Sequence, residues 1–233
     1  MHKILDGIYT IQGLRVGRVY VIQSTDGLTL IDTSVEGAEH GIARDLAHKG
    51  YTLKDIRRIL ITHAHPDHVG ALAALVRASS AQVYAHALET PIIRGEKSVT
   101  YAPNYRDTAF TRLFSALLGI RGMPSAQVDR IIAEGDSLPE VLPDLQVIEV
   151  PGHTYGQVAF YSPARKLLFC GDAVVRFGGR LSLPLAAFTS DMAQAKRSIK
   201  KLAALDVETL CFGHGAPITH GASAPLRAFA NDL

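Results

Sequence analysis

The chain has 233 residues, of which 47% are hydrophobic and 20% are charged. This composition excludes an intrinsically disordered chain, and the length is sufficient for one domain with a sizeable core. The formal net charge of +2 gives no argument for a nucleic-acid or anionic-membrane partner. No stretch approaches the roughly 18 apolar residues of a membrane-spanning helix, and the N-terminal apolar stretch is too short for a signal peptide. We therefore expect a cytoplasmic protein that binds neither nucleic acid nor a membrane.

The first part of the chain predicts strands that alternate with helices. Asp26-Gly27 is a strong hairpin-turn signal between two apolar runs. Expected strands cover residues 7–11, 18–23, 28–32, 59–61 and 82–85, and expected helices cover 41–49 and 70–77. Such alternation favours a layered α/β domain.

Residues 91–124 interrupt this alternation with several prolines and glycines. A helix is expected at 105–118, where Phe and Leu recur at helical spacing. An insertion of this kind commonly forms a lid or a wall of the substrate site, and a homodimer contact or plain packing is an equally open alternative. Tyr101 and Tyr105 are candidate substrate contacts in this lid-like insertion.

The second half of the chain continues with strands and two helices. Ser190 or Thr189 can cap the first of these helices, which begins near residue 191, and the second is expected at 224–230. Expected strands cover residues 128–132, 145–150, 158–162, 166–172 and 208–212. Cys170 and Cys211 lie in apolar strand-like runs, so we expect two buried free thiols. No linker or repeat is visible, and residues 1–233 are predicted to form a single domain.

The run Thr62-His63-Ala64-His65-Pro66-Asp67-His68 contains four potential metal ligands, which fall in the six positions from His63 to His68. An apolar strand precedes this run and a helix follows it, which places the ligands on a turn at a strand end. Imidazole nitrogens and carboxylate oxygens suit Zn²⁺ and other first-row metals. Asp67 alone could cap the following helix, but capping does not account for all four residues.

Three further strand ends carry residues of the same chemical types. His153 and His214 each follow a glycine in a short turn, and Asp172 follows Gly171. Asp32 closes an early strand. On the sequence alone each carboxylate could equally be a turn or capping residue, and each histidine could be solvated.

The run from His63 to His68 resembles the His-x-His-x-Asp-His signature of the metallo-β-lactamase superfamily. The later residues His153, Asp172 and His214 match that family in order, so the resemblance covers nearly the whole chain. It implies an α/β fold, the αββα sandwich of two mixed β-sheets with outer helices.

The resemblance also implies a ligand set for two metals. Family members tend to carry an Asp at the position of Asp32, which implies that it accepts a hydrogen bond from a metal-bound histidine. Zinc is the expected metal, at two ions per chain, and Mn²⁺ or Fe²⁺ are alternatives. The implied ligands are His63, His65 and His153 for the first metal, Asp67, His68 and His214 for the second, and Asp172 as the bridge.

The pattern looks most like glyoxalase-II-type thioesterases and lactonases. It implies hydrolysis of an ester, thioester, lactone or amide bond of a small acyl substrate by a hydroxide held between the metals. Asp67 would orient this hydroxide or relay its proton, and Asp172 would complete the catalytic centre. Tyr155 and Phe177 are candidate substrate contacts. Arg176 could bind a substrate carboxylate, although solvation is the favoured interpretation.

Other functions share parts of this pattern. A persulfide dioxygenase-like oxidoreductase would use one iron held by His63, His153 and Asp172. A zinc β-lactamase and a non-enzymatic effector-binding protein rank lower. Metal content separates the first alternative from the hydrolase.

Overall fold

The computed structural model describes the chain except for residues 100, 103–112, 114–115, 118–119 and 121. Most of the helix predicted at 105–118, and the candidate contact Tyr105, lie outside the described residues. The chain divides into two compact units. Unit 1 comprises Met1–Val99 with Arg106–Ile131, and unit 2 comprises Thr100–Tyr105 with Ile132–Leu233.

Unit 1 is built on a seven-stranded mixed sheet with the strands in sequence order from β1 to β7. Strands β1 to β4 pair antiparallel, and β4, β5 and β6 pair parallel. The Asp26-Gly27 hairpin is confirmed, because Ser24 pairs with Gly27. The strands are β1 (His2–Leu5), β2 (Ile8–Thr10), β3 (Tyr20–Ser24), β4 (Gly27–Ile31), β5 (Ile56–Leu60), β6 (Gln82–His86) and β7 (Arg130–Ile132), whose last residue belongs to unit 2.

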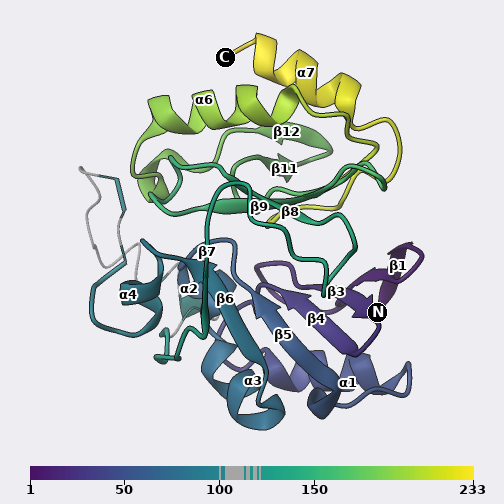
Figure 1. The fold of residues 1–233 in the computed structure, drawn as a ribbon. Coiled ribbons are helices and arrows are strands. Elements are labelled where there is room, and N and C mark those ends of the chain that lie inside the picture. The colour runs from purple at the N-terminus through teal and green to yellow at the C-terminus, as the bar shows by residue number, and fades with distance from the viewer. Residues whose placement is uncertain (100, 103–112, 114–115, 118–119, 121) are drawn as a thin grey trace. The chain divides into compact units, whose positions relative to one another are not determined.

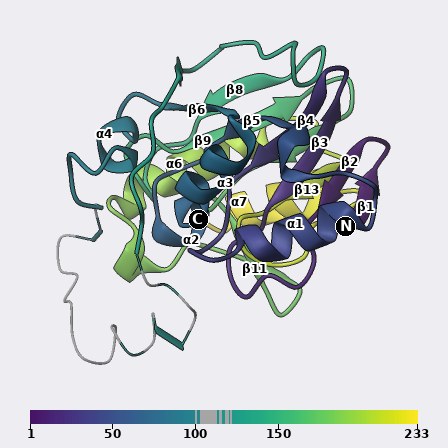
Figure 2. The ribbon, with the colours of Figure 1, turned by 90° about the horizontal axis from the view of Figure 1, so that it is seen from below.

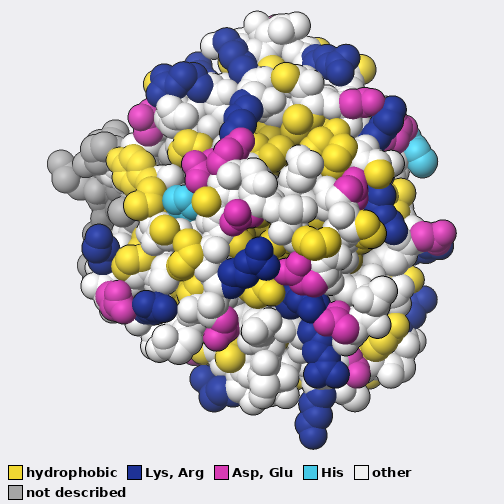
Figure 3. Space-filling view, viewed as in Figure 1, with side chains coloured by type: hydrophobic (Ala, Val, Ile, Leu, Met, Phe, Trp, Pro, Cys, Tyr) yellow, Lys and Arg dark blue, Asp and Glu magenta, His cyan; other side chains and the backbone are white. Residues whose placement is uncertain are grey.

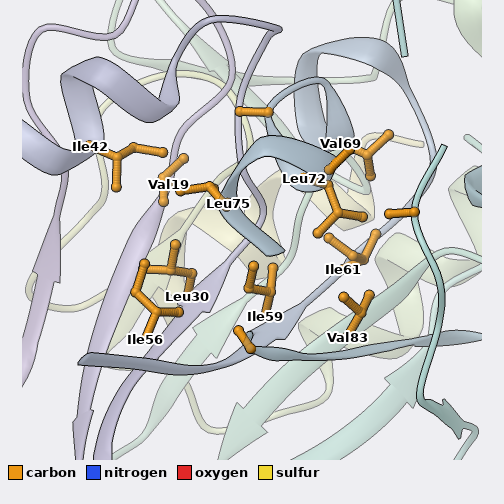
Figure 4. Packing of buried hydrophobic residues seen from close by; sticks show 14 of the residues in the cluster. Val19, Leu30, Ile42, Ile56, Ile59, Ile61, Val69, Leu72, Leu75 and Val83 are labelled. Atoms are coloured by element: carbon orange, nitrogen blue, oxygen red, sulfur yellow. The ribbon is translucent and has the colours of Figure 1, made fainter. Parts of the chain in front are cut away.

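Helices α1 and α3 lie on the same side of this sheet, as Figures 1 and 2 show. Leu72 of α3 lies beside Ile61, Leu75 of α3 lies beside Val19, and Ile42 of α1 belongs to the same buried cluster (Figure 4). Full burial of such a side chain contributes about 1.5–3 kcal/mol. The helical elements are α1 (Glu39–Ala47), the 3₁₀ turn η1 (Leu53–Asp55), α2 (Pro66–Val69), α3 (Leu72–Ser79) and α4 (Thr90–Ile93).

Unit 2 is built on a four-stranded mixed sheet in the order β13-β10-β9-β8 and a separate β11-β12 hairpin. Helices α6 and α7 lie side by side in unit 2 (Figure 1), and Ile199 and Leu202 of α6 share a core with Leu226 of α7. The elements are β8 (Gln146–Glu149), β9 (Val158–Ser162), β10 (Leu167–Phe169), β11 (Val175–Phe177), β12 (Arg180–Ser182), the 3₁₀ turn η2 (Ala186–Phe188), α6 (Met192–Ala203), β13 (Thr209–Cys211) and α7 (Ser223–Asn231).

Two local predictions were wrong, one for the turn that carries Asp67 and His68 and one for the N-cap of α6. The ligand turn is not wholly irregular, because Asp67 and His68 lie in the short helix α2, with Pro66 favouring its first turn. The predicted caps Ser190 and Thr189 are not the N-cap of α6. Asp191 takes this role, and its carboxylate accepts a hydrogen bond from the Gln194 backbone N–H at 2.8 Å.

One face of the molecule carries both signs of charge (Figure 3). In the space-filling view of Figure 3, Lys and Arg side chains are interspersed with Asp and Glu side chains over the visible face. Among the described residues, no helix combines the length and the apolar character needed to cross a bilayer.

Candidate metal centre

The ligand-rich run of unit 1 lies between β5 and α3. His63, His65 and His68 are buried and Asp67 is half-buried. The ring centroid of His63 lies 4.8 Å from that of His65 and 4.1 Å from that of His68. A Cβ on Gly70 would lie 2.3 Å from the backbone nitrogen of Glu36, so only glycine fits where the run leaves α2. Unit 1 therefore gathers three imidazoles in one buried turn.

Asp32 is the hydrogen-bond centre beneath this turn. Its carboxylate accepts hydrogen bonds from the Thr62 backbone N–H at 2.8 Å and the Thr62 hydroxyl at 2.7 Å. Its Oδ2 also lies 2.9 Å from Nδ1 of His68. The parallel pairing of Ile31 with Leu60 explains the meeting, because Asp32 and Thr62 emerge from neighbouring strands at the same sheet edge. Asp32 thus contacts one of the candidate ligands directly.

These contacts define the tautomers of two histidines. A carboxylate only accepts hydrogen bonds, so the ring nitrogen of His68 that faces Asp32 must carry the proton. The Thr62 hydroxyl gives its hydrogen to Asp32 and can therefore only accept from Nδ1 of His63, which lies 3.0 Å away. In both rings the lone pair is then on Nε2, which is the atom that could bind a metal.

Glu89 holds the backbone of the same run and was not found from the sequence. It is buried, and its Oε2 accepts a hydrogen bond from the backbone N–H of Ala64 at 2.7 Å. Thr33 also holds this run, because its backbone N–H and its hydroxyl both donate to the carbonyl of His68. A lone Glu after a strand carries no sequence signal, so only the tertiary structure shows this contact.

Unit 2 brings His153, Asp172 and His214 together. Nε2 of His153 lies 3.6 Å from Oδ2 of Asp172, and Nε2 of His214 lies 3.2 Å from the same oxygen. Strands β10 and β13 are parallel, with Phe169 opposite Cys211. Asp172 and His214 each follow these paired residues by three positions, so both reach the same edge of the sheet.

The turn that carries His153 is packed against the start of α6. A Cβ on Gly152 would lie 2.2 Å from the backbone nitrogen of Ala195, so the two segments are in close contact. The His153 carbonyl accepts a hydrogen bond from the backbone N–H of Ser190 at 3.1 Å, and the Thr189 hydroxyl lies 3.1 Å from Nδ1 of His153. Thr189 is a second contact residue that was not assigned to the site from the sequence.

Arg176 fastens the loop that carries His214. Its guanidinium donates hydrogen bonds to the carbonyls of Ala216 at 3.0 Å and Pro217 at 3.2 Å, and its backbone N–H donates to the carbonyl of His214 at 3.1 Å. Gly215 is required here, because a Cβ would lie 2.1 Å from the Arg176 carbonyl oxygen. The interpretation of Arg176 as a solvated side chain was therefore wrong.

The candidate substrate residues occupy different environments. Tyr155 and Phe177 are 55% and 51% exposed. Tyr101 is half-buried, and its ring packs edge-on against Phe188 with 5.8 Å between the centroids. Cys170 is buried, and burial raises the pKa of its thiol, which donates to the Val174 carbonyl. Cys170 is therefore not presented as a thiolate ligand.

Comparison with known proteins identifies relatives over most of the chain. The metallo-β-lactamase superfamily model matches residues 13–214. "Probable metallo-hydrolase YflN" of Bacillus subtilis (strain 168) is 27% identical over 220 residues, which cover 88% of this chain and 83% of that protein. A hydroxyacylglutathione hydrolase of Fuscovulum blasticum is 32% identical over 171 residues, which cover 72% of this chain and 51% of that enzyme. The chain thus aligns with only about half the length of that enzyme.

A solved structure gives the same result for the fold. The crystal structure of TTHA1623 in a di-iron-bound form superimposes with a TM-score of 0.64 and 30% identity, covering 90% of this chain and 92% of that one. Together with the mixed sheets of each unit, these similarities confirm the predicted fold class.

Proposed function

The chain belongs to the metallo-β-lactamase superfamily, and on that premise we propose that it is a metal-dependent hydrolase of a small acyl substrate. The observation that carries the proposal is the state of its histidines. His63 and His68 each engage Nδ1 with a partner that can only accept, which leaves the Nε2 lone pair for a metal. Histidines that merely filled a core would need no common orientation of this kind.

The donor set fits a pair of divalent metals. Our proposed ligands are imidazoles and carboxylates with no thiolate, which suits zinc, manganese or iron. We assign His63, His65 and His153 to a first metal, Asp67, His68 and His214 to a second, and Asp172 to both. Three nitrogens on the first metal would leave an open position, as in catalytic rather than structural zinc sites.

A bound pair of such metals lowers the pKa of a water molecule toward about 7 and polarises the substrate carbonyl. The chain's own residues would hold and direct the reactants. Asp67 is half-buried at the start of α2, and we assign it to orient the attacking water and accept its proton. Asp32 keeps His68 oriented through its hydrogen bond. Water adds to the acyl carbon, the bond to oxygen, sulfur or nitrogen breaks, and the leaving group takes up a proton.

The substrate class rests on the family and on one relative. The Fuscovulum blasticum relative is named as a hydrolase of hydroxyacylglutathione, but the alignment covers only 51% of that enzyme, so this substrate is not carried over. We propose an ester, thioester, lactone or amide of a small acyl group, with Tyr155 and Phe177 as candidate contacts because both present exposed rings beside ligand-bearing turns.

Elemental analysis of the full chain, purified without added metal, tests this proposal. About two zinc or manganese ions per chain, reduced in His153→Ala, are expected. His220→Ala is the control, because His220 is exposed and lies outside the proposed ligand set. A panel of thioesters, lactones and β-lactams would then define the substrate. About one iron per chain with oxygen consumption would replace the hydrolase by a dioxygenase, and no metal even after supplementation would contradict the ligand assignment.

A further inference from the structure

Thr189 occupies a buried position beside the His153 ring, at the end of the η2 turn. Its hydroxyl oxygen lies 3.1 Å from Nδ1 of His153 and 2.9 Å from the carbonyl oxygen of Leu185. The side chain is only 3% exposed, so water does not compete freely for these bonds. The hydroxyl has one hydrogen to give and two neighbours that could take it.

The Leu185 carbonyl determines the direction of the Thr189 hydrogen bonds. A carbonyl oxygen can only accept, so an O···O distance of 2.9 Å requires the Thr189 hydroxyl to donate to Leu185. Toward His153 the same oxygen can then only accept, and Nδ1 must carry the ring proton. The lone pair of His153 is placed on Nε2, the nitrogen that faces Asp172.

We propose that Thr189 is the positioning residue of His153, fixing the ring in its Nδ1–H form so that Nε2 is presented to a metal. The inference rests on the proposed function insofar as that metal is concerned. It extends to unit 2 the arrangement of unit 1, where the Thr62 hydroxyl is held by Asp32 and accepts from His63. In this arrangement, the tautomers of His63 and His153 would each be fixed by a threonine hydroxyl that donates its hydrogen to another acceptor.

The backbone around His153 is held independently of this hydroxyl. The backbone N–H of Ser190 donates to the His153 carbonyl at 3.1 Å, and the backbone N–H of Asp191 donates to the Gly152 carbonyl at 2.9 Å. Ser198 donates its hydroxyl to the Pro151 carbonyl at 2.7 Å. Loss of the Thr189 hydroxyl should therefore change the ring more than the turn.

Four variants of the full chain separate these effects. Thr189→Val keeps the shape and removes the hydroxyl, whereas Thr189→Ser restores it. Ser198→Ala is the matched control, because Ser198 is equally buried and holds the same turn without touching the ring. His153→Gln assigns the His153 signals in the spectra.

The first readout is the imidazole N–H of His153 in long-range proton–nitrogen NMR spectra of the purified protein. A slowly exchanging proton on Nδ1 is expected in the wild type, in Thr189→Ser and in Ser198→Ala. It should be lost or moved to Nε2 in Thr189→Val. Persistence of the Nδ1 proton in Thr189→Val, or its absence from the wild type, would overturn the proposal.

The second readout is zinc affinity by chelator competition. Thr189→Val should lower the zinc affinity of one site by about 10-fold. Loss of a hydrogen-bond partner of a metal-bound histidine typically lowers metal affinity by about 10–100-fold. Thr189→Ser should recover the affinity. A loss no greater than that of Ser198→Ala would reject the positioning role. If the wild type binds no zinc at all, the proposed function fails, and the NMR readout still decides the role of Thr189.

Discussion

The carboxylate of Asp32 and Nδ1 of His68 lie 2.9 Å apart, both buried, although the residues are 36 positions apart in the chain. Asp32 has a φ of +59°, a left-handed conformation that is unusual for a residue other than glycine. The backbone thus adopts an unfavourable conformation at the residue whose carboxylate accepts hydrogen bonds from both Thr62 and His68. Such strain is characteristic of positions with a functional constraint.

Substitution of Asp32 should separate charge from backbone strain. Asp32→Asn keeps a side chain that tolerates the left-handed region but replaces an acceptor-only group, so zinc affinity should fall by about 10–100-fold. Asp32→Ala should unfold at a lower denaturant concentration than Asp32→Asn, because alanine adds a backbone cost of about 1–2 kcal/mol. Urea unfolding and chelator competition measure the two effects. Unchanged zinc affinity in both variants would show that Asp32 does not orient a ligand.

Gly17 and Gly13 provide a matched pair in one loop of unit 1. Their φ values are +67° and +74°, so alanine at either position carries a similar left-handed cost of about 1–2 kcal/mol. A Cβ on Gly17 would also lie 1.9 Å from the carbonyl oxygen of Asp67, whereas none of the described atoms lies within 4 Å of a Cβ on Gly13. Gly17→Ala should therefore be the less stable variant in urea and should lose metal. Equal unfolding midpoints and equal metal content would count against this close contact.

Arg176 should matter for the binding of a metal at the proposed second site rather than for the binding of a charged substrate group. Arg176→Lys cannot reproduce the guanidinium hydrogen bonds to Ala216 and Pro217, each worth about 0.5–1.5 kcal/mol, so the His214 loop should loosen. The expected result is a roughly 10-fold weaker zinc site with little change at the other site, measured by titration with zinc. Arg180→Lys, on the paired strand β12, is the control. Equal effects of the two substitutions would contradict the role of Arg176 as a loop clamp.

The ion pair between Asp26 and Arg58 should make the free energy of unfolding depend on pH. This pair lies at the end of the strands opposite to Asp32 and Thr62. The hydrogen bond from Arg58, which opposes burial, lowers the pKa of the Asp26 carboxyl. The stabilisation is therefore present above the unfolded pKa of about 3.9 and is lost as the pH falls through the lower folded pKa. Asp26→Asn should cost up to about 1 kcal/mol at pH 7, because the carboxylate is half-exposed.

Urea unfolding of the wild type and Asp26→Asn between pH 7 and pH 2 measures this difference. The two curves should converge only at the acid end. A gap between them that stays constant down to pH 2 would mean that the Asp26 charge does not stabilise the fold.

The sequence predicted the features that depend on local patterns. The Asp26-Gly27 turn was found because its two residues suit a tight hairpin. The apolar runs of both sheets predicted strands at the positions of β2–β10 and β13, whereas β1 (His2–Leu5) was not predicted. The β11-β12 hairpin was missed because each strand has three residues, although Gly178 and Gly179 at its turn both have positive φ. A Gly-Gly pair was the available signal.

The contacts around the candidate ligands could not be predicted in the same way. Glu89, Thr189 and Arg176 act on residues 25, 36 and 40 positions away along the chain. Their neighbours are decided by how helices and strands pack, and no local pattern distinguishes a buried glutamate at a ligand turn from a solvated one. The ligand candidates themselves stood out because several metal-binding residue types followed strand ends.

The parallel pairing of β10 with β13 has a consequence for the order of events during synthesis. The cluster of His63, His65 and His68 can form once β5 and α3 have left the ribosome, whereas His214 reaches Asp172 only after the long crossover through α6 has folded. Because parallel strands joined by long connections pair slowly, a nascent chain would carry an incomplete ligand set for an extended period. A proposed metal site that needs both Asp172 and His214 would then be completed only late in synthesis.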